Sequence, residues 1–147
     1  KMLERAGLST LTPANFEQFE QAVFPTAKLS AGKLETVERM LAFFTTHSIN
    51  WHQLSDAEVL EQLSGIKGIG KWTIDMILLY TLQRPDVFPC DDFHLKEMMV
   101  KLYGLNPASR LKAQMLEVSG AWADDRSLAV LYLLDWKARL KKGAINA

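Results

Sequence analysis

The 147-residue chain has little of several features that would mark a protein class. It has one cysteine, Cys90, which excludes an internal disulfide and any zinc or iron–sulfur site that needs several cysteines, and fits a reducing compartment. Its 17 basic and 17 acidic residues cancel, so a nucleic acid would have to be bound by a local patch. Its apolar runs are far too short to cross a membrane. We therefore expect an intracellular protein without a membrane partner.

Helical patterns fill the chain, and no segment of any length has the alternation of a strand. Glycine, proline and cap residues divide it into segments of roughly 10 to 18 residues, a common range for helices. Helices are predicted to begin just after Thr12, Ser30, Ser55, Asn106, and Asp124 or Asp125. We expect an all-α helical bundle that forms a single domain over residues 1–147.

Three glycines, Gly65, Gly68 and Gly70, lie between two helical patterns. This spacing predicts a tight backbone turn that something approaches closely. A Gly-rich turn that leads into a helix offers free N–H groups to a phosphate, although a plain connection between two helices is the alternative. The helix that follows, 71–82, is apolar almost all round and is expected to be the most buried element.

The next segment, 84–89, contains two prolines and cannot be helical. It ends near two adjacent carboxylates, and Asp91 or Asp92 is expected to cap a helix that runs to Leu102. Such a cap is the structural alternative to any chemical role for this pair.

A resemblance to a known family rests on three stretches, 68–73 (GIGKWT), 84–89 (RPDVFP) and 91–92 (DD). Together they resemble the helix-hairpin-helix and Gly/Pro-Asp core of the DNA glycosylase superfamily, most of all the alkylated-purine (3-methyladenine) DNA glycosylases. A fourth stretch, 122–129, with Trp122, Arg126 and Ser127, is similar to another signature of that family. The resemblance covers roughly residues 11–136 and implies a helix-hairpin-helix within the all-α fold.

The resemblance implies that Asp92 is the catalytic carboxylate. Cleavage of an N-glycosidic bond makes the sugar oxocarbenium-like, so a fixed anion beside it is favourable in the transition state. Family members that also cut the strand carry a nucleophilic lysine where this chain has Trp72, and Lys71 lies about 100° round the helix. The chain is therefore expected to be monofunctional and to use water.

The base is expected to be flipped out of the duplex and held on an aromatic face. Trp72 is the predicted face, with Met76 and Leu134 as further base-binding residues, and it is expected to lie across the extruded nucleotide from Asp92. A cationic alkylated base would be attracted to such a ring. The alternative for Trp72 is a buried core tryptophan.

The hairpin is expected to bind the DNA backbone. By the resemblance, the amides of Gly68, Gly70 and Lys71 would hold a phosphate, with charge from Lys67 and Lys71 and a contact from Thr73. No cofactor and no iron–sulfur cluster are expected, but Na⁺ or K⁺ would bind to three main-chain carbonyls, those of Ser64, Ile66 and Ile69.

The resemblance leaves two alternatives and one gap. The hairpin also occurs in non-catalytic DNA-binding modules, and a uracil or mismatch glycosylase is the nearest other enzyme. Family members carry helices ahead of this segment, with a Gln motif and a wedge residue, that have no counterpart here. We expect either the C-terminal part of a longer enzyme or a loss of the wedge. The expected partner is double-stranded DNA with an alkylated base, bound by a monomer in the cytoplasm (at the nucleoid) or in the nucleus.

Overall fold

The computed structural model describes residues 2–27 and 29–141, and all regular elements in these ranges are helical. This confirms the prediction of an all-α fold. The α-helices are α1 (Met2–Arg5), α2 (Phe16–Val23), α3 (Ala31–Thr46), α4 (Asp56–Ser64), α5 (Lys71–Met76), α6 (Phe93–Tyr103), α7 (Leu111–Ser119) and α8 (Arg126–Lys141). No helix of the described residues is long and apolar enough to span a bilayer.

The chain divides into two compact units at the bond between Gly70 and Lys71. The first contains α1 to α4 and the glycine hairpin, and the second contains α5 to α8. The single domain expected over residues 1–147 stays a prediction.

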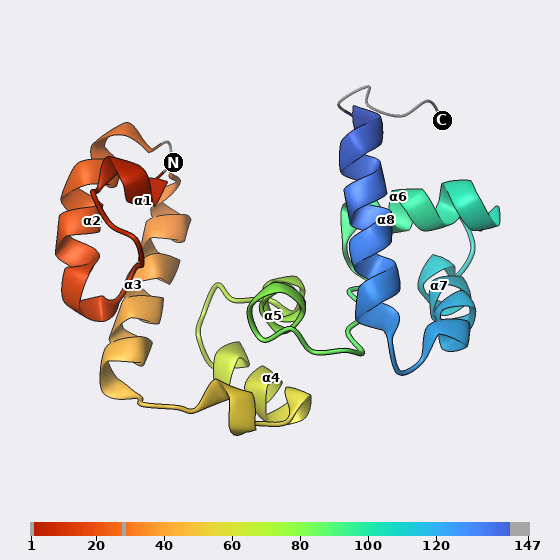
Figure 1. Cartoon of the computed structure of the whole chain (residues 1–147), viewed down its shortest axis with the longest axis horizontal. Coiled ribbons are helices and arrows are strands. Elements are labelled where there is room, and N and C mark those ends of the chain that lie inside the picture. The colour runs from red at the N-terminus through yellow and green to blue at the C-terminus, as the bar shows by residue number, and fades with distance from the viewer. Residues whose placement is uncertain (1, 28, 142–147) are drawn as a thin grey trace. The chain divides into compact units, whose positions relative to one another are not determined.

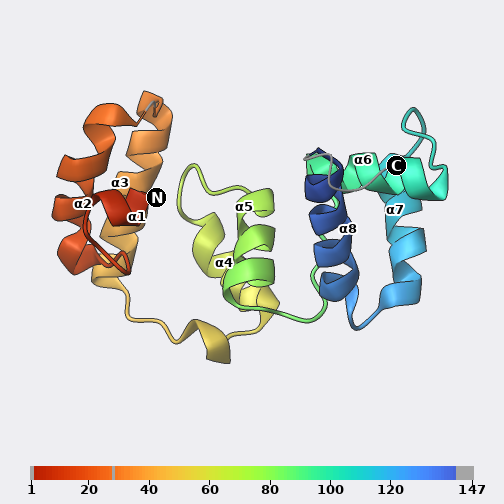
Figure 2. The same cartoon turned by 45° about the horizontal axis from the view of Figure 1, so that its top comes forward.

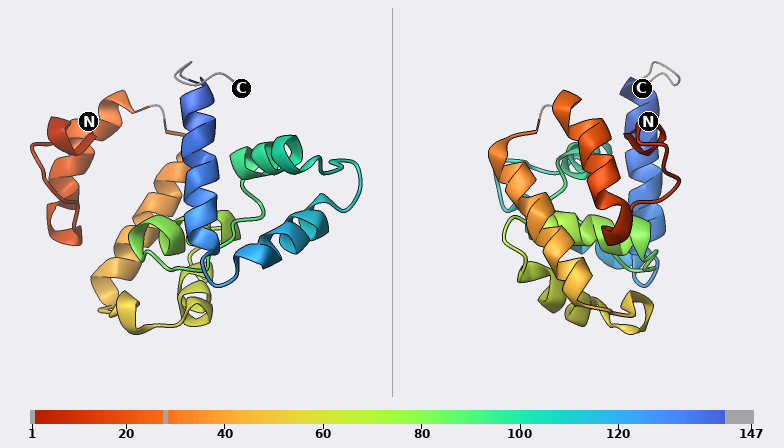
Figure 3. Two further views of the ribbon diagram at one scale, coloured as in Figure 1. Left: turned by 45° about the vertical axis from the view of Figure 1, so that its right-hand side comes forward. Right: turned by 90° about the vertical axis from the view of Figure 1, so that its left-hand side faces the viewer.

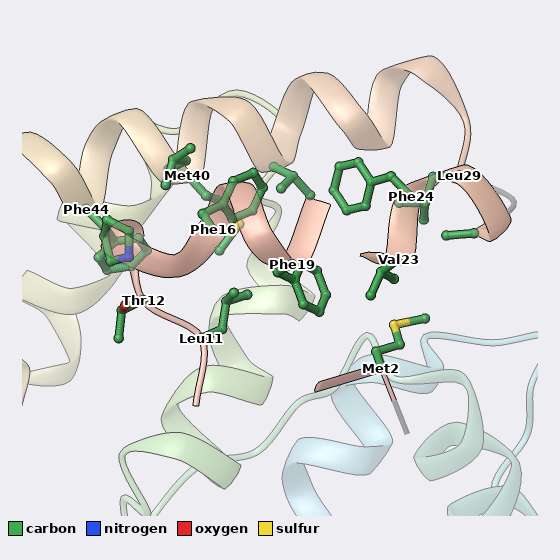
Figure 4. Close-up of a pocket in the computed structure, with 14 residues that line it drawn as sticks. Met2, Leu11, Thr12, Phe16, Phe19, Val23, Phe24, Leu29, Met40 and Phe44 are labelled. Atoms are coloured by element: carbon green, nitrogen blue, oxygen red, sulfur yellow. The ribbon is translucent and has the colours of Figure 1, made fainter. Parts of the chain in front are cut away.

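In the first unit, α2 and α3 lie side by side (Figures 1 and 2). The inward face of α2 carries Phe16, Phe19 and Val23, which are all buried. On α3 none of the residues is buried, and Phe44 is 37% exposed. The two helices border an apolar cavity of about 660 Å³ (Figure 4).

The cap predicted ahead of α4 is present. The Glu58 amide donates to Ser55 Oγ at 3.3 Å, and the Ser55 amide donates to Glu58 Oε2 at 2.7 Å. The hydrogen bonds from Ser55 hold the pKa of Glu58 below its usual value, because they favour the charged form. This capping box fixes the start of the helix that leads into the glycine hairpin.

In the second unit, α6 packs against α8 (Figure 1), and α6 and α7 lie on the same side of α8 (left view of Figure 3). The residues that close this core have less than 2% of their surface exposed and come from three helices, namely Leu95, Met98, Met99, Met115 and Val130. Gly104 ends α6 in the left-handed conformation that favours glycine, with φ at 63°.

The segment 71–82 begins as α5 and continues as a π-helical turn, η4 (Ile77–Thr81). As expected, it buries more residues than any other described helix, namely Ile74, Asp75, Leu78, Leu79 and Leu82, although Trp72 and Tyr80 are 48% and 53% exposed. One sequence prediction in this unit is wrong. The helix expected after Asn106 starts only at Leu111. Asn106 instead accepts a hydrogen bond from the Ala108 amide at 2.9 Å, a local turn that competes with helix formation.

Candidate functional site

Asp92 is a buried carboxylate at the first turn of α6, 6% exposed. Its Oδ1 accepts a hydrogen bond from the Leu95 amide at 2.8 Å, which is the geometry of an N-cap. Its own amide donates to the Pro89 carbonyl at 2.8 Å, so this hydrogen bond connects the proline-containing loop to the start of α6. The cap expected at Asp91 or Asp92 is thus Asp92 itself, the residue that the family resemblance marks as catalytic.

Trp72 donates a hydrogen bond to this carboxylate. The indole Nε1–H donates to Asp92 Oδ2 at 2.8 Å, across 20 residues of sequence. Both carboxylate oxygens therefore carry an N–H donor. The two side chains contact each other, whereas sequence reasoning placed them on opposite sides of a nucleotide. Trp72 is also half exposed, so the alternative of a fully buried core tryptophan is wrong.

Lys71 forms a separate ion pair with Asp75. Its Nζ donates to both oxygens of Asp75 at 2.7 and 2.8 Å, and Asp75 is only 4% exposed. Half of the lysine side chain remains in contact with solvent. Sequence reasoning missed Asp75, although an acidic residue four places after a lysine in a predicted helix is a visible signal.

The loop between η4 and α6 is clamped to the start of α8. Arg126 donates to Oδ1 and Oδ2 of Asp86 at 2.6 Å each, and Ser127 Oγ accepts from the Val87 amide at 2.8 Å. The same hydroxyl donates to the Arg84 carbonyl at 2.6 Å. The bonds from Arg126 hold the pKa of Asp86 below its ordinary value and raise that of Arg126. Spacing alone could not have revealed these contacts, which join residues about 40 positions apart.

Tyr80 is an aromatic residue of this region that sequence reasoning missed. Burial raises the pKa of its hydroxyl, and the negative charge of Asp92 raises it further, which requires the two groups to lie near each other. The spacing of Trp72, Met76 and Tyr80, four residues apart, was the available signal. The π-helical turn that carries Tyr80 is a rare element that occurs often at functional sites.

The glycine hairpin has two internal hydrogen bonds that shape it. The Ile66 amide donates to Leu63 O at 3.1 Å, and the Ile69 amide donates to Ile66 O at 3.0 Å. Gly68 has φ at +101°, and a Cβ at this position would lie 2.1 Å from Thr36 Oγ1. The close neighbour of Gly68 on that side is therefore α3 of the same unit.

Gly70 differs from Gly68 in both respects. Its backbone does not have positive φ, and a Cβ would meet no described atom within 4 Å. In the part of the chain that the structure describes, nothing requires glycine at this position.

The remaining predicted site residues differ in how far they are buried. Among the base-binding and backbone-binding residues, Met76, Leu134 and Thr73 are partly buried on their helices and Lys67 is exposed. Among the proposed carbonyl donors, Ile66 is buried, Ile69 is partly buried and Ser64 is exposed. Their roles stay predictions. In residues 2–27 and 29–141 no cluster of three or more His, Cys, Asp or Glu side chains could hold a metal ion.

Comparison with known proteins identifies similar chains. No protein-family model matches. DNA-3-methyladenine glycosylase 1 of Schizosaccharomyces pombe is 31% identical over 130 residues, which are 86% of this chain and 56% of that relative. The chain therefore spans about half of the length of that curated relative.

Two solved structures resemble the fold. The 3-methyladenine DNA glycosylase of Schizosaccharomyces pombe, solved in complex with abasic DNA, has a TM-score of 0.72 and 28% identity over 94% of this chain and 70% of its own. The DNA-3-methyladenine glycosidase of Bacillus halodurans has a TM-score of 0.71 and 25% identity over 95% of this chain and 65% of its own. The sequence motifs, the capped carboxylate and these similarities agree: in sequence and in fold the chain is similar to the 3-methyladenine DNA glycosylases, which have the helix-hairpin-helix glycosylase fold.

Proposed function

We propose that this protein is a monofunctional DNA N-glycosylase that hydrolyses the bond between an alkylated purine and deoxyribose in duplex DNA. The observation that carries the proposal is the Asp92 carboxylate, buried at the start of α6 with an N–H donor on each oxygen. The names of the similar proteins, which are 3-methyladenine glycosylases, support the choice of substrate.

Asp92 acts as an anion in this mechanism. As the base leaves, positive charge develops on the sugar, and a carboxylate held in place stabilises that charge without reorganising. The N-terminus of α6 and the two N–H donors place positive partial charges against both carboxylate oxygens. The same group can orient the water that attacks the sugar.

The base is extracted by flipping and held on the exposed part of Trp72. A purine alkylated at a ring nitrogen carries positive charge and is attracted to the indole face. Met76, four residues along the same helix, and Leu134 of α8 are the proposed apolar neighbours of the base.

Strand cleavage is not part of the proposed reaction. A strand-cutting relative would need an amine at position 72 to form a Schiff base, and here that position is an indole. The neighbouring Lys71 amine is held by both oxygens of Asp75. Water is therefore the nucleophile.

The DNA backbone is held by the hairpin. The amides of Gly68, Gly70 and Lys71 are the proposed phosphate donors, with Lys67, Lys71 and Thr73 adding side-chain contacts.

The proposed Na⁺ or K⁺ ligands are the carbonyls of Ser64, Ile66 and Ile69. Ile66 O already accepts one bond, from the Ile69 amide, and its second lone pair remains for a cation. The hydrogen bond to Ile66 O is therefore compatible with the proposed cation.

The test is release of free 3-methyladenine from methylated duplex DNA by the protein and by Asp92→Asn. Asparagine keeps the size and the capping ability of aspartate but removes the charge, so folding is expected to persist while the rate falls by roughly 100-fold or more. Asp91→Asn, a neighbouring exposed carboxylate near Lys96 and Lys112, is the control. A fully active Asp92→Asn protein contradicts the assignment.

Two other outcomes separate the alternatives. Because the chain spans about half of its relative, a non-catalytic DNA-binding module is a second candidate. Salt-dependent binding to plain duplex without release of any base would support it. Excision of uracil or mismatched bases in preference to methylated purines would indicate a different glycosylase. We propose a monomer that works where genomic DNA is held, at the nucleoid or in the nucleus.

A further inference from the structure

We infer that Trp72 is a positioning residue, which acts on the reaction through its indole N–H by holding the Asp92 carboxylate in its productive orientation. This role is separate from stacking on the base. The inference rests on the proposed function, because it concerns the carboxylate that stabilises the sugar cation.

The carboxylate needs a second donor to be fixed. The χ2 torsion of an aspartate is broad, so a single hydrogen bond, from the Leu95 amide to Oδ1, leaves the carboxylate plane free to rotate. The bond from Trp72 Nε1 to Oδ2 removes that freedom. Both bonds are charge-assisted, and such bonds are about twice as strong as neutral ones. A carboxylate fixed in this way needs no reorganisation when charge develops on the sugar.

The donor is itself held by a packed element. Two residues of the segment that carries Trp72, Ile74 and Leu78, are 1% and 6% exposed, so the backbone of this segment is anchored in the core of the second unit. On the other side of the bond, Leu95 is fully buried. The hydrogen bond therefore joins α5 and α6, two elements that are both fixed inside one unit.

The two roles use different parts of one side chain. The N–H lies at the edge of the indole, and Trp72 as a whole is 48% exposed. A ring can therefore donate from its edge to Asp92 and still offer a face to a base. Removal of the N–H alone should impair chemistry without impairing binding.

The experiment places 3-(3-benzothienyl)alanine at position 72. This analogue keeps the bicyclic aromatic shape and replaces the N–H by sulfur. We expect the single-turnover rate of 3-methyladenine release to fall by roughly 10-fold or more, the usual loss for a hydrogen bond to a charged group. The KM for methylated duplex and the affinity for plain duplex should change by less than about 2-fold, since the stacking face is kept.

Three comparisons make the result specific. Trp72→Leu removes both N–H and ring, so it should lower the rate and also raise KM. The same analogue at Trp51, whose ring lies against Phe43 and Phe44 in the first unit, should leave rate and KM unchanged. In the ¹⁵N spectrum, the Trp72 indole resonance should move in Asp92→Asn and stay in place in Asp91→Asn, which a merely space-filling tryptophan would not show.

The outcomes separate this inference from the proposed function. If the unmodified protein releases no methylated base, the proposed function is wrong and the positioning role falls with it. If the unmodified protein is active and the benzothienyl protein is equally fast, or is impaired only in KM, the proposed function stands and the positioning role alone is wrong.

Discussion

The two compact units use their apolar side chains differently. In the second unit, Leu95 and Met99 of α6 and Met115 of α7 are completely buried, and α6 packs against α8. In the first unit, α3 buries none of its residues, and an apolar cavity of about 660 Å³ lies open beside Phe16, Met40 and Phe44 (Figure 4). The helices of the second unit bury these side chains completely, whereas a cavity remains beside α2 and α3 of the first unit.

This difference shows where precise chemistry can be supported. The carboxylate of Asp92 and the indole of Trp72 both lie in the second unit, where buried residues such as Leu95 fix the helices that carry them. Catalytic groups need such support, because a small misplacement lowers the rate strongly. The first unit contributes a hairpin whose proposed task, holding a phosphate by backbone amides, depends on local turn geometry alone.

The largest expected effect tests the two cores directly. Met98→Ala removes a side chain that is 1% exposed and should lower the free energy of unfolding by about 2–5 kcal/mol, the usual cost of a cavity in a closed core. Met40→Ala, the matched change at the cavity of the first unit, should cost less than about 1 kcal/mol because little packing is lost there. Urea denaturation measures both. Equal losses would show that the cores do not differ.

Gly68→Ala tests a place where the first unit is tightly packed. The new Cβ would lie 2.1 Å from Thr36 Oγ1 on a backbone with φ at +101°, so we expect a loss of roughly 1–3 kcal/mol in the free energy of unfolding.

A second substitution divides this loss between its two causes. Thr36→Ala in the same chain removes the hydroxyl and should restore part of the stability, while the backbone strain remains. A Gly68→Ala protein as stable as the parent would contradict the described hairpin.

The Asp86–Arg126 pair tests the clamp of the second unit through its pH dependence. Arg126 holds the pKa of Asp86 below its ordinary value, so the pair stabilises the folded state fully above about pH 4 and loses this effect as the pH falls through the lower, folded-state pKa. Asp86→Asn should therefore cost up to about 1 kcal/mol at pH 7 and almost nothing near pH 2, measured by urea unfolding.

A more exposed pair serves as the control for that measurement. Asp135→Asn breaks the ion pair with Arg139, in which both side chains are more than half exposed, and should have little effect at any pH. If the two variants lost the same free energy of unfolding, the Asp86–Arg126 pair would contribute no more to stability than an exposed ion pair.

Local signals were enough to predict much of the fold. A helix begins just after Ser55 as predicted, with Ser55 and Glu58 forming its cap, and Asp92 is found at the helix start that the sequence suggested. The site residues Asp92 and Trp72 could be named because a motif places them in sequence. What joins them, an indole N–H to a carboxylate, could not be predicted because spacing does not give side-chain orientation.

The errors also have physical causes. An Asn-Pro pair is typical both of a helix start and of a turn. At Asn106 the side chain favours the turn, because it accepts a hydrogen bond from the Ala108 amide. A π-helical turn shifts the helical period, which hid the exposure of Tyr80. The pairing of Asp86 with Arg126 joins residues that are 40 positions apart in the sequence, and the local sequence pattern does not predict it.

Gly70→Ala is expected to have the smallest effect on stability and the most informative effect on binding. A Cβ at this position meets no described atom within 4 Å, and its backbone suits any residue, so the substitution should leave the free energy of unfolding unchanged or raise it by up to about 1 kcal/mol. A glycine that the described fold does not need is explained if a partner approaches the backbone closely there.

Affinity for plain duplex should therefore fall in Gly70→Ala, measured by fluorescence anisotropy, while its salt dependence stays the same because no charge is removed. Lys67→Gln is the matched variant, since it should lower affinity and also reduce the salt slope by about one unit. If Gly70→Ala binds duplex as tightly as the parent, the phosphate does not approach the hairpin at this residue, and the first unit would need to hold DNA by side-chain charge instead.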